Sequence, residues 1–237
     1  MPRRDRKSRK ERGTDKKVGG FAFFLSLFFL SALGSFNLLL IPALIDTQAL
    51  LNWLYFAGGC LLGCGLAVLF ITGHYSVFLH ELRHSILSNL VGNKAKSMKV
   101  RKSSGHFEYQ YTKATAEYNA FISLAPYFLP VFTVAGLIIG FATCYSNHKL
   151  VVLIAATGYG IDLVLNMRDI SPYQTDLSLI SGGYRIGLAY VIAINLTLFS
   201  IFAAWISQGP VGLKYLVYGL WRFMLQIVAY YRGGGIS

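Results

Sequence analysis

The sequence predicts an all-α polytopic membrane protein with about five to six transmembrane helices and a short β-hairpin in a cytoplasmic loop. Hydrophobic residues make up 54% of the 237 residues and only 14% are charged, whereas a soluble domain carries about a quarter charged residues. The apolar residues also gather in runs close to the ~20 residues that cross a bilayer. These observations exclude a soluble globular enzyme, a disordered chain and a secreted disulfide scaffold.

The apolar runs give the order of the predicted spans. The first run is too long for the core of a signal peptide and is therefore expected to stay as a span. Five spans are predicted at residues 21–41, 50–72, 121–144, 151–167 and 187–205. The last stretch, 211–231, contains Lys214 and Arg222, so it is either a sixth span or a helix lying in the membrane interface.

Two elements are predicted between the second and third spans. Residues 77–91 form an amphipathic helix that Gly92 and Asn93 end, since both residues are common helix stop signals. A break near Gly73 would separate this helix from the second span. The following loop, 94–113, contains the alternating aromatic residues 107, 109 and 111, a spacing that indicates a hairpin.

The distribution of positive charge indicates how the chain is oriented in the membrane. The net charge is +12, and its basic residues gather in the tail 1–19, in the loop 94–113 and in the segment 168–185. Loops rich in Lys and Arg stay in the cytoplasm, which places the N-terminus and both of these later segments on the cytoplasmic side. Residues 20–237 then form a single membrane domain, expected in a bacterial inner membrane.

Basic clusters beside apolar spans also bind anionic lipid headgroups, so membrane lipids are expected partners. Nucleic acid is not, because no nucleic-acid-binding fold accompanies the charge. The oligomeric state is left open by the sequence.

The residues that indicate chemistry are His80, Glu81 and His84, in the segment HELRH. Two histidines four residues apart project from one face of a helix. Both imidazoles can then bind one zinc ion, while the intervening glutamate acts on water at the metal as a general base. The sequence therefore predicts one zinc ion, with Glu81 as the catalytic residue. The alternative is that the three residues form only the polar face of a helix at the membrane edge.

Zinc in a catalytic site needs a third protein ligand and leaves a fourth position for water. Three aspartates follow the motif on the side of the membrane that the topology gives to His84. Asp162 lies within the fourth span, Asp169 ends that span, and Asp176 follows a loop.

The motif and these later polar residues resemble the site-2 protease class of intramembrane zinc metalloproteases. In that class the third ligand is an aspartate on a later span, preceded by an asparagine, and Asn166 and Asp169 match those positions. The resemblance covers about residues 55–185 and implies hydrolysis of peptide bonds in membrane-protein substrates, in or near the bilayer. It favours Asp169 as the ligand, with Asp176 as the second choice.

The resemblance also implies a substrate-binding region. Related proteases carry an extended segment after the motif that pairs with unfolded substrate, and here that segment contains Gly105 and His106. Gly105 permits a turn or bulge, and His106 is equally well explained as a residue of a solvated loop. Asn166 is expected to contribute to substrate binding. Pro126 and Pro130 open the third span, where they either kink it beside the cavity or serve in packing.

The chain departs from the family pattern at two places. Arg83 stands where a small residue is usual, so it either points toward lipid headgroups or hinders close helix packing. The Asn-Pro and Leu-Asp-Gly sequences of the family are absent as such. These departures motivate an alternative function, a non-catalytic scaffold that binds partner transmembrane segments. A small transporter that relays ions through Asp162 is a third possibility, against which the few spans and the lack of a repeat argue.

Overall fold

A computed structural model of the chain describes residues 26–36, 49–102 and 104–232. In these residues a short helix, Ser26–Phe36, precedes eight further α-helices, two strands that form one small sheet, and two 3-10 turns. Their bounds are α2 Leu50–Phe70, α3 His74–Leu90, β1 Lys94–Val100, β2 Gly105–Gln110, α4 Asn119–Leu124, α5 Val131–Cys144, α6 His148–Arg168, α7 Thr175–Ser178, α8 Gly183–Gln208 and α9 Pro210–Tyr231. The described part of the chain is therefore mostly helical, and its two strands form the hairpin β1–β2.

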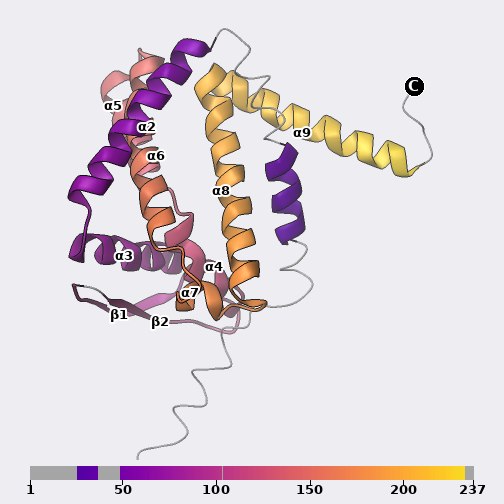
Figure 1. Ribbon diagram of the computed structural model, residues 1–237. Coiled ribbons are helices and arrows are strands. Elements are labelled where there is room, and N and C mark those ends of the chain that lie inside the picture. Colours follow the sequence, from indigo (N-terminus) through magenta and orange to yellow (C-terminus); the bar gives the residue numbers. More distant parts are fainter. Residues whose placement is uncertain (1–25, 37–48, 103, 233–237) are drawn as a thin grey trace, which may run out of the picture.

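Three of the described helices, α2, α6 and α8, are long and apolar enough to cross a membrane. They coincide with three of the predicted spans and form the upper bundle in Figure 1. Of the predicted first span, 21–41, the structure describes only the helix Ser26–Phe36, and the remainder lies outside the described residues. Helix α9 is not among the helices that meet this criterion in the described part of the chain.

The predicted third span is broken into two parts. Helix α4 continues through a 3-10 turn at Ala125–Tyr127, and α5 begins at Val131 after a bend of 68°. Pro126 and Pro130 flank this bend, and a proline cannot donate the backbone hydrogen bond that would continue a helix. The two parts together are long and apolar enough for a fourth span. The carbonyls of Ile122 and Pro126, which precede the bend, contact the side chains of His84 and Arg83 on α3.

Helices α2 and α6 pack closely through glycines. A Cβ atom on Gly63 would overlap the carbonyl of Thr157, and one on Gly160 would overlap the carbonyl of Cys60. Small residues at such contacts allow helix backbones in membranes to approach each other. This packing fixes the ends of α2 and α6 relative to each other. It thereby positions the elements that follow them, α3 after α2 and the loop 169–174 after α6.

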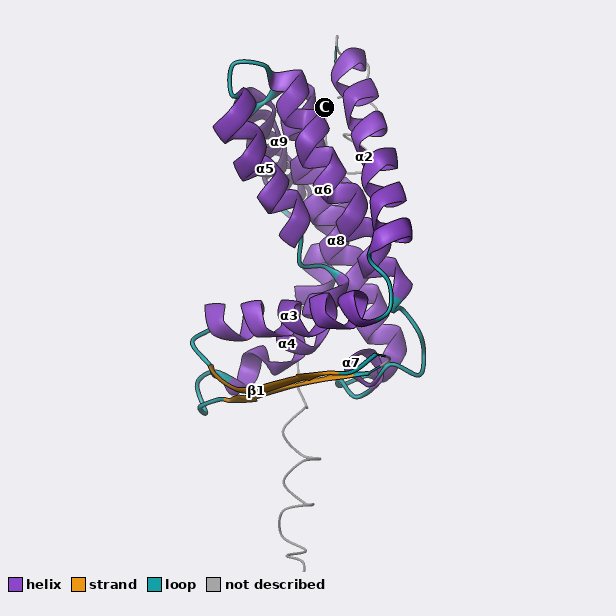
Figure 2. Ribbon diagram, turned by 90° about the vertical axis from the view of Figure 1, so that its left-hand side faces the viewer, coloured by secondary structure: helices purple, strands orange, loops and turns teal. Residues whose placement is uncertain are grey.

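Helix α3 lies across the end of the bundle, between the bundle and the hairpin (Figure 2). The chain turns between α2 and α3 at Gly73, whose φ of 55° is unfavourable for residues with a Cβ. The hairpin strands are antiparallel, with Met98 opposite Phe107 and Val100 opposite Gly105. The amphipathic helix predicted at 77–91 and the hairpin predicted at 94–113 are thus confirmed.

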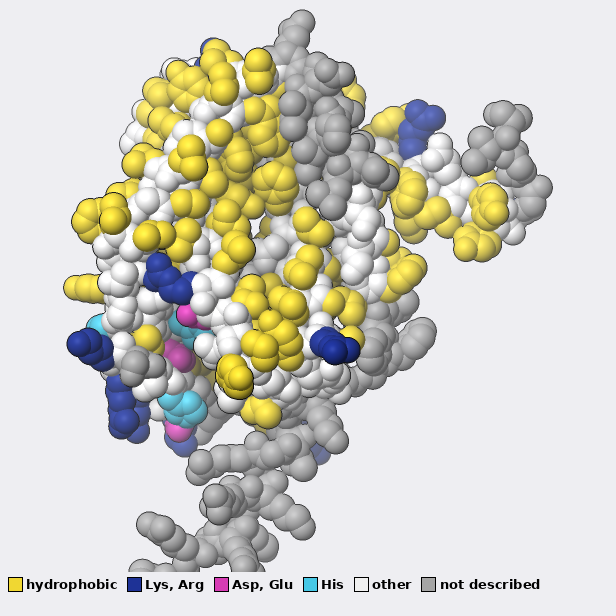
Figure 3. Space-filling view, in the orientation of Figure 1, with side chains coloured by type: hydrophobic (Ala, Val, Ile, Leu, Met, Phe, Trp, Pro, Cys, Tyr) yellow, Lys and Arg dark blue, Asp and Glu magenta, His cyan; other side chains and the backbone are white. Residues whose placement is uncertain are grey.

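The surface of the molecule is hydrophobic around the helical bundle and more polar at the end that carries α3 and the hairpin. Hydrophobic side chains cover most of the face shown in Figure 3 around the bundle, while histidine, acidic and several basic side chains gather at the end where α3 and the hairpin lie. Beneath that end, Leu124, Tyr127, Leu177 and Tyr190 form a buried core. This core ties α4, α7 and α8 together under the polar residues of the site.

Candidate metal centre

His80, His84 and Asp176 meet at one point in the structure. His80 and His84 lie one turn apart on α3, and Asp176 lies in the first turn of the short helix α7. The Oδ2 atom of Asp176 is 3.3 Å from the Nε2 atom of each histidine. Ligand atoms of the three residues all lie within 4.8 Å of one another.

These separations suit a tetrahedral metal ion. Nitrogen and oxygen ligands lie about 2.0–2.2 Å from zinc, so two ligands of a tetrahedral zinc are about 3.3–3.6 Å apart. Both Nε2–Oδ2 separations are 3.3 Å, at the lower end of this range. Two imidazoles and one carboxylate are also a ligand set of catalytic zinc, in which a fourth position stays open for water.

The other ring nitrogens of the two histidines are held by acceptors. The Nδ1 atom of His84 is 2.6 Å from the carbonyl oxygen of Ile122, and that of His80 is 3.0 Å from Asp169 Oδ2. Because a carbonyl can only accept, His84 carries its proton on Nδ1, and its neutral form presents a lone pair on Nε2. Such outer hydrogen bonds are the usual means of orienting histidine ligands toward a metal.

Hydrogen bonds within the cluster shift the pKa values of His80 and Asp176. Burial lowers the pKa of His80, but hydrogen bonds to Asp169 and Asp176 outweigh it and raise the pKa to about 9. Burial likewise raises the pKa of Asp176, yet hydrogen bonds from the two histidines prevail and hold it well below its usual range. The carboxylate of Asp176 is therefore ionised at neutral pH, as a metal ligand must be.

Glu81 lies beside this cluster, under strand β2. Its side chain is 7% exposed, and burial raises its pKa above the usual value. A Cβ atom on Gly105 would overlap the Glu81 carboxylate, so only glycine at this position lets β2 approach so closely. Glu81 and the two histidines line a cleft of about 550 Å³, whose wall also contains Gly105 and His106. A raised pKa in a cleft is typical of a general base.

The geometry favours Asp176 over Asp169 as the third ligand, which reverses the order of preference taken from the family resemblance. Asp169 lines the same cleft but contacts the outer nitrogen of His80. The loop between them, with a turn at Ser171–Gln174, carries Asp176 back over α3. Gly105 and His106 border the cleft as predicted for substrate-binding residues, although a role in binding stays a prediction.

Arg83 points into the protein, so the prediction that it faces lipid headgroups is wrong. It is 2% exposed and donates hydrogen bonds to the Pro126 carbonyl at 2.7 Å, the Asn166 side chain at 2.7 Å and Asp162 at 2.6 Å. Arg83 fills the space between α3 and the bundle instead of hindering their packing. An arginine in this place can be tolerated because α6 supplies the opposite charge.

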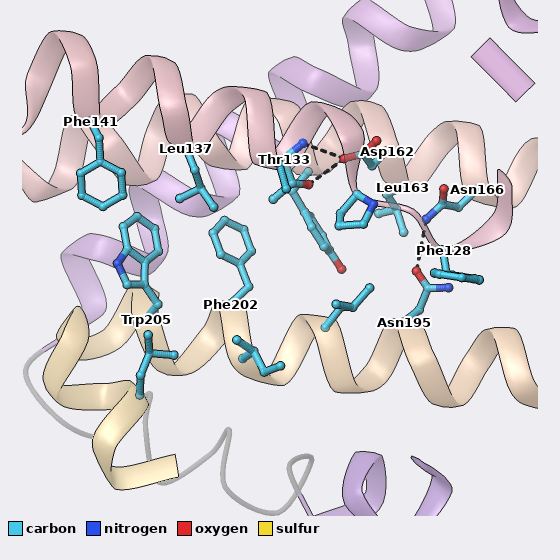
Figure 4. Close-up of a pocket in the computed structure, with 16 residues that line it drawn as sticks. Phe128, Thr133, Leu137, Phe141, Asp162, Leu163, Asn166, Asn195, Phe202 and Trp205 are labelled. Carbon is cyan, nitrogen blue, oxygen red and sulfur yellow. Dashed lines mark hydrogen bonds between the residues drawn. The ribbon is translucent and has the colours of Figure 1, made fainter. Parts of the chain in front are cut away.

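Asp162 receives further hydrogen bonds from the start of α5. The backbone N–H and the hydroxyl of Thr133 donate to its Oδ2 atom at 2.7 and 2.8 Å (Figure 4). Phe132 donates from its backbone to Oδ1 at 3.2 Å. The ion pair Arg83–Asp162 therefore joins α3, α5 and α6. The sequence suggested Asp162 only as a candidate zinc ligand or as the ion relay of a transporter. Its pairing with Arg83 and Thr133 was not predicted, because these partners are 79 and 29 residues away.

Asn166 belongs to this network and not to the cleft around the histidines. Its Nδ2 atom donates to the Asn195 side chain at 3.2 Å. Both residues line a second, largely apolar cavity of about 460 Å³ between α5, α6 and α8 (Figure 4). Asn166 was predicted to bind substrate beside the metal, and the structure places it instead as a partner of Arg83.

Tyr127 is a further residue that the sequence did not single out. Its ring packs edge-on against His80, with ring centroids 5.7 Å apart, and the side chain is fully buried. The carbonyl of Ile122 is likewise a contact without a sequence signal, since any residue supplies a backbone carbonyl. The only available signal was the proline pair that bends the chain here.

No family model, curated protein or solved structure matches the chain.

Proposed function

We propose that this chain is a zinc-dependent endopeptidase, embedded in a membrane, that hydrolyses peptide bonds of other membrane proteins at the end of its helical bundle. The observation that supports this most directly is the meeting of His80, His84 and Asp176 at ligand distances, with Glu81 beside them in a cleft. The resemblance of HELRH to the site-2 protease class agrees with this chemistry.

The residues suit the roles that such a reaction requires. Bound zinc supplies Lewis acidity, which activates water and polarises the peptide carbonyl. His80, His84 and Asp176 hold the ion, and Asp169 and the Ile122 carbonyl orient the two rings. The Glu81 carboxylate accepts the proton of the attacking water and returns it to the leaving amine nitrogen.

The hairpin offers a place for the substrate chain. In the described part of the chain β2 pairs only with β1, and residues of β2 line the cleft. An extended substrate segment that pairs with the free edge of β2 would lie across Glu81. The basic residues of the hairpin support a cytoplasmic position for this end of the bundle, because loops rich in Lys and Arg tend to stay in the cytoplasm.

The first test is the zinc content of the detergent-purified protein. We expect about one zinc ion per chain in the wild type, with loss of the ion in His80→Ala, His84→Ala and Asp176→Ala. Glu81→Gln is the matched control, because it should keep the zinc. A folded wild type without zinc would overturn the metal centre.

The second test concerns catalysis and uses fluorescein-labelled casein as an unfolded polypeptide probe. The zinc-loaded wild type should release fluorescent fragments, and zinc-loaded Glu81→Gln should release almost none. Equal cleavage by the two proteins would refute the role of Glu81. Zinc binding without cleavage of casein or of membrane-embedded single-span peptides would favour the non-catalytic scaffold.

A further inference from the structure

Helix α9 extends away from the bundle at the end opposite the metal centre (Figure 1). Only its start is packed closely, since a Cβ atom on Gly212 would overlap the carbonyl of Ala204 in α8. Gly212 and Leu216 are its two buried residues. The chain turns into α9 at Gly209, which has a φ of 58°. Beyond its start, Phe223 of this 22-residue helix stacks on Phe36 of the helix Ser26–Phe36, with ring centroids 4.6 Å apart. Most other side chains after Leu216 are exposed.

The two faces of α9 differ in polarity. Successive helical residues are about 100° apart around the axis, so the sequence can be divided into two faces. One face contains every charged and amide side chain of the helix, with two tyrosines: Lys214, Tyr215, Tyr218, Arg222 and Gln226. Val211, Leu225 and Ala229 lie among them on this face. The opposite face is apolar: Leu213, Leu216, Val217, Leu220, Phe223, Met224, Ile227 and Val228.

The polar face has only positive charge. Residues 210–232 contain no Asp or Glu, while Lys214, Arg222 and Arg232 are all exposed. The guanidinium of Arg222 lies 5.9 Å from the centre of the Tyr218 ring, a cation–π contact. This face is complementary to anionic groups, and tyrosine beside lysine and arginine is typical of the headgroup level of a bilayer.

Neither water alone nor a transmembrane position suits this helix. Val217, Met224 and Val228 on the apolar face are 67%, 48% and 42% exposed, and such a continuous apolar face is unfavourable in water. In a transmembrane helix, Arg222 would lie near the middle of α9 and thus in the hydrocarbon core. A charge there is costly unless it has a partner, and its contact in the structure is the uncharged ring of Tyr218.

We propose that α9 lies in the plane of the membrane interface, at the end of the bundle opposite the metal centre. Its apolar face enters the acyl region, and Lys214 and Arg222 contact the phosphates of anionic phospholipids. The inference rests on the proposed membrane location of the chain. It is independent of zinc binding and of proteolysis.

Accessibility of single cysteines tests the placement of α9. Full-length protein with Cys60, Cys64 and Cys144 replaced by alanine would carry one new cysteine and be reconstituted in vesicles, with a charged maleimide on both sides. We expect labelling several-fold faster at Tyr215, Tyr218, Arg222 and Gln226 than at the control positions Val217, Met224 and Val228. A spanning helix would show labelling only near its ends, irrespective of face, and would overturn the proposal. Protection at all seven positions would also overturn it, by indicating a second copy or another protein on this helix.

Lipid dependence tests the headgroup contact. The melting temperature of the full-length protein would be compared in nanodiscs of phosphatidylcholine with and without phosphatidylglycerol. We expect phosphatidylglycerol to raise it in the wild type and to raise it less in Lys214→Gln/Arg222→Gln. The double variant Lys94→Gln/Lys96→Gln removes two charges from the basic hairpin, so it shows how much of the effect any two basic residues beside the bilayer produce. A loss in this variant as large as in the α9 variant would also overturn a specific contact of α9. An equal effect of phosphatidylglycerol on the wild type and the α9 variant would overturn the headgroup contact. Because neither test involves His80 or Glu81, failure here leaves the proposed protease untouched.

Discussion

Asp169 and Asp176 both contact His80, but from opposite sides of its ring. Asp176 approaches Nε2, where a metal would bind, whereas Asp169 approaches Nδ1, away from that point. A ligand supplies a bond to the ion, while an outer partner only orients and polarises the ligand. The two aspartates should therefore differ in how strongly their loss affects zinc.

Asp169→Asn should keep one zinc ion per chain but weaken its binding by about 10–100-fold, as is typical for outer partners of ligands. Asp176→Asn should lose the stoichiometric ion, because a carboxamide is a poor ligand for zinc. Zinc titration against a competing chelator measures both, with Glu108→Gln on the exposed part of the hairpin as control. If Asp169→Asn loses the ion and Asp176→Asn retains it, Asp169 is the ligand and Asp176 the outer partner.

The ion pair Arg83–Asp162 should be important for stability because both side chains are almost fully buried. Arg83→Met would leave the carboxylate of Asp162 buried without its charged partner, at a cost of about 3–5 kcal/mol in the free energy of unfolding. The double variant Arg83→Met/Asp162→Asn should cost less than the sum of the two single changes, since it leaves no unpaired charge.

Denaturant unfolding in detergent measures these free energies, and Arg101→Met at an exposed position is the matched control. If the loss in Arg83→Met is no larger than that in the control, the pair does not hold α3 to the bundle. Strict additivity of the two single changes would likewise contradict direct coupling.

At the scale of elements, the close contact of strand β2 with α3 depends on one glycine. Gly105→Ala would push the Glu81 carboxylate from its place, because the added methyl group needs the space that the carboxylate occupies. We expect cleavage to slow by about 100-fold, as a displacement of about 1 Å in a catalytic group can cause, with unchanged zinc content. Ser104→Ala, next to it in the chain, is the control. Full activity in Gly105→Ala would show that β2 does not determine the position of Glu81.

The elements that the sequence predicted well are those with a local pattern. The spacing of His80 and His84 with apolar neighbours predicts α3, and alternation at Phe107 and Tyr109 predicts β2. The break of the third span at Pro126 and Pro130 was left open, because prolines in membrane helices are also accommodated by neighbouring helices. Helix α7 was missed, since four residues are too few for a periodic signal.

At the scale of the whole molecule, the candidate metal centre brings together residues that are distant in the sequence. His80 and Asp176 are 96 residues apart, so a shared ion would link α3 to the segment after α6. An ion that binds only the folded chain stabilises it by about 2.7 kcal/mol at a concentration 100 times the Kd. The melting temperature should thus rise with zinc and fall with a chelator. His80→Ala/His84→Ala should show neither shift, and equal shifts in both proteins would place the effect of zinc elsewhere.

The site was only partly predictable, because some of its residues are far apart in the sequence. His80, Glu81 and His84 share one helix, so their spacing alone brings them together. The choice between Asp169 and Asp176 depends on the path of the loop that joins them, and the role of Asn166 depends on Arg83. Pairings such as Arg83–Asp162 arise from tertiary packing between helices, for which one sequence contains no periodic signal.

The ion pair also has a consequence for how this chain can change over evolution. A mutation at either Arg83 or Asp162 alone leaves a buried charge without its partner, so neither position can drift independently. Lineages should either keep arginine and aspartate together or replace both within a short interval. In related sequences the residue within the motif, HELRH, and the residue in the fourth span would then vary as a pair, which makes the arginine between the two histidines a marker for an aspartate 79 residues later.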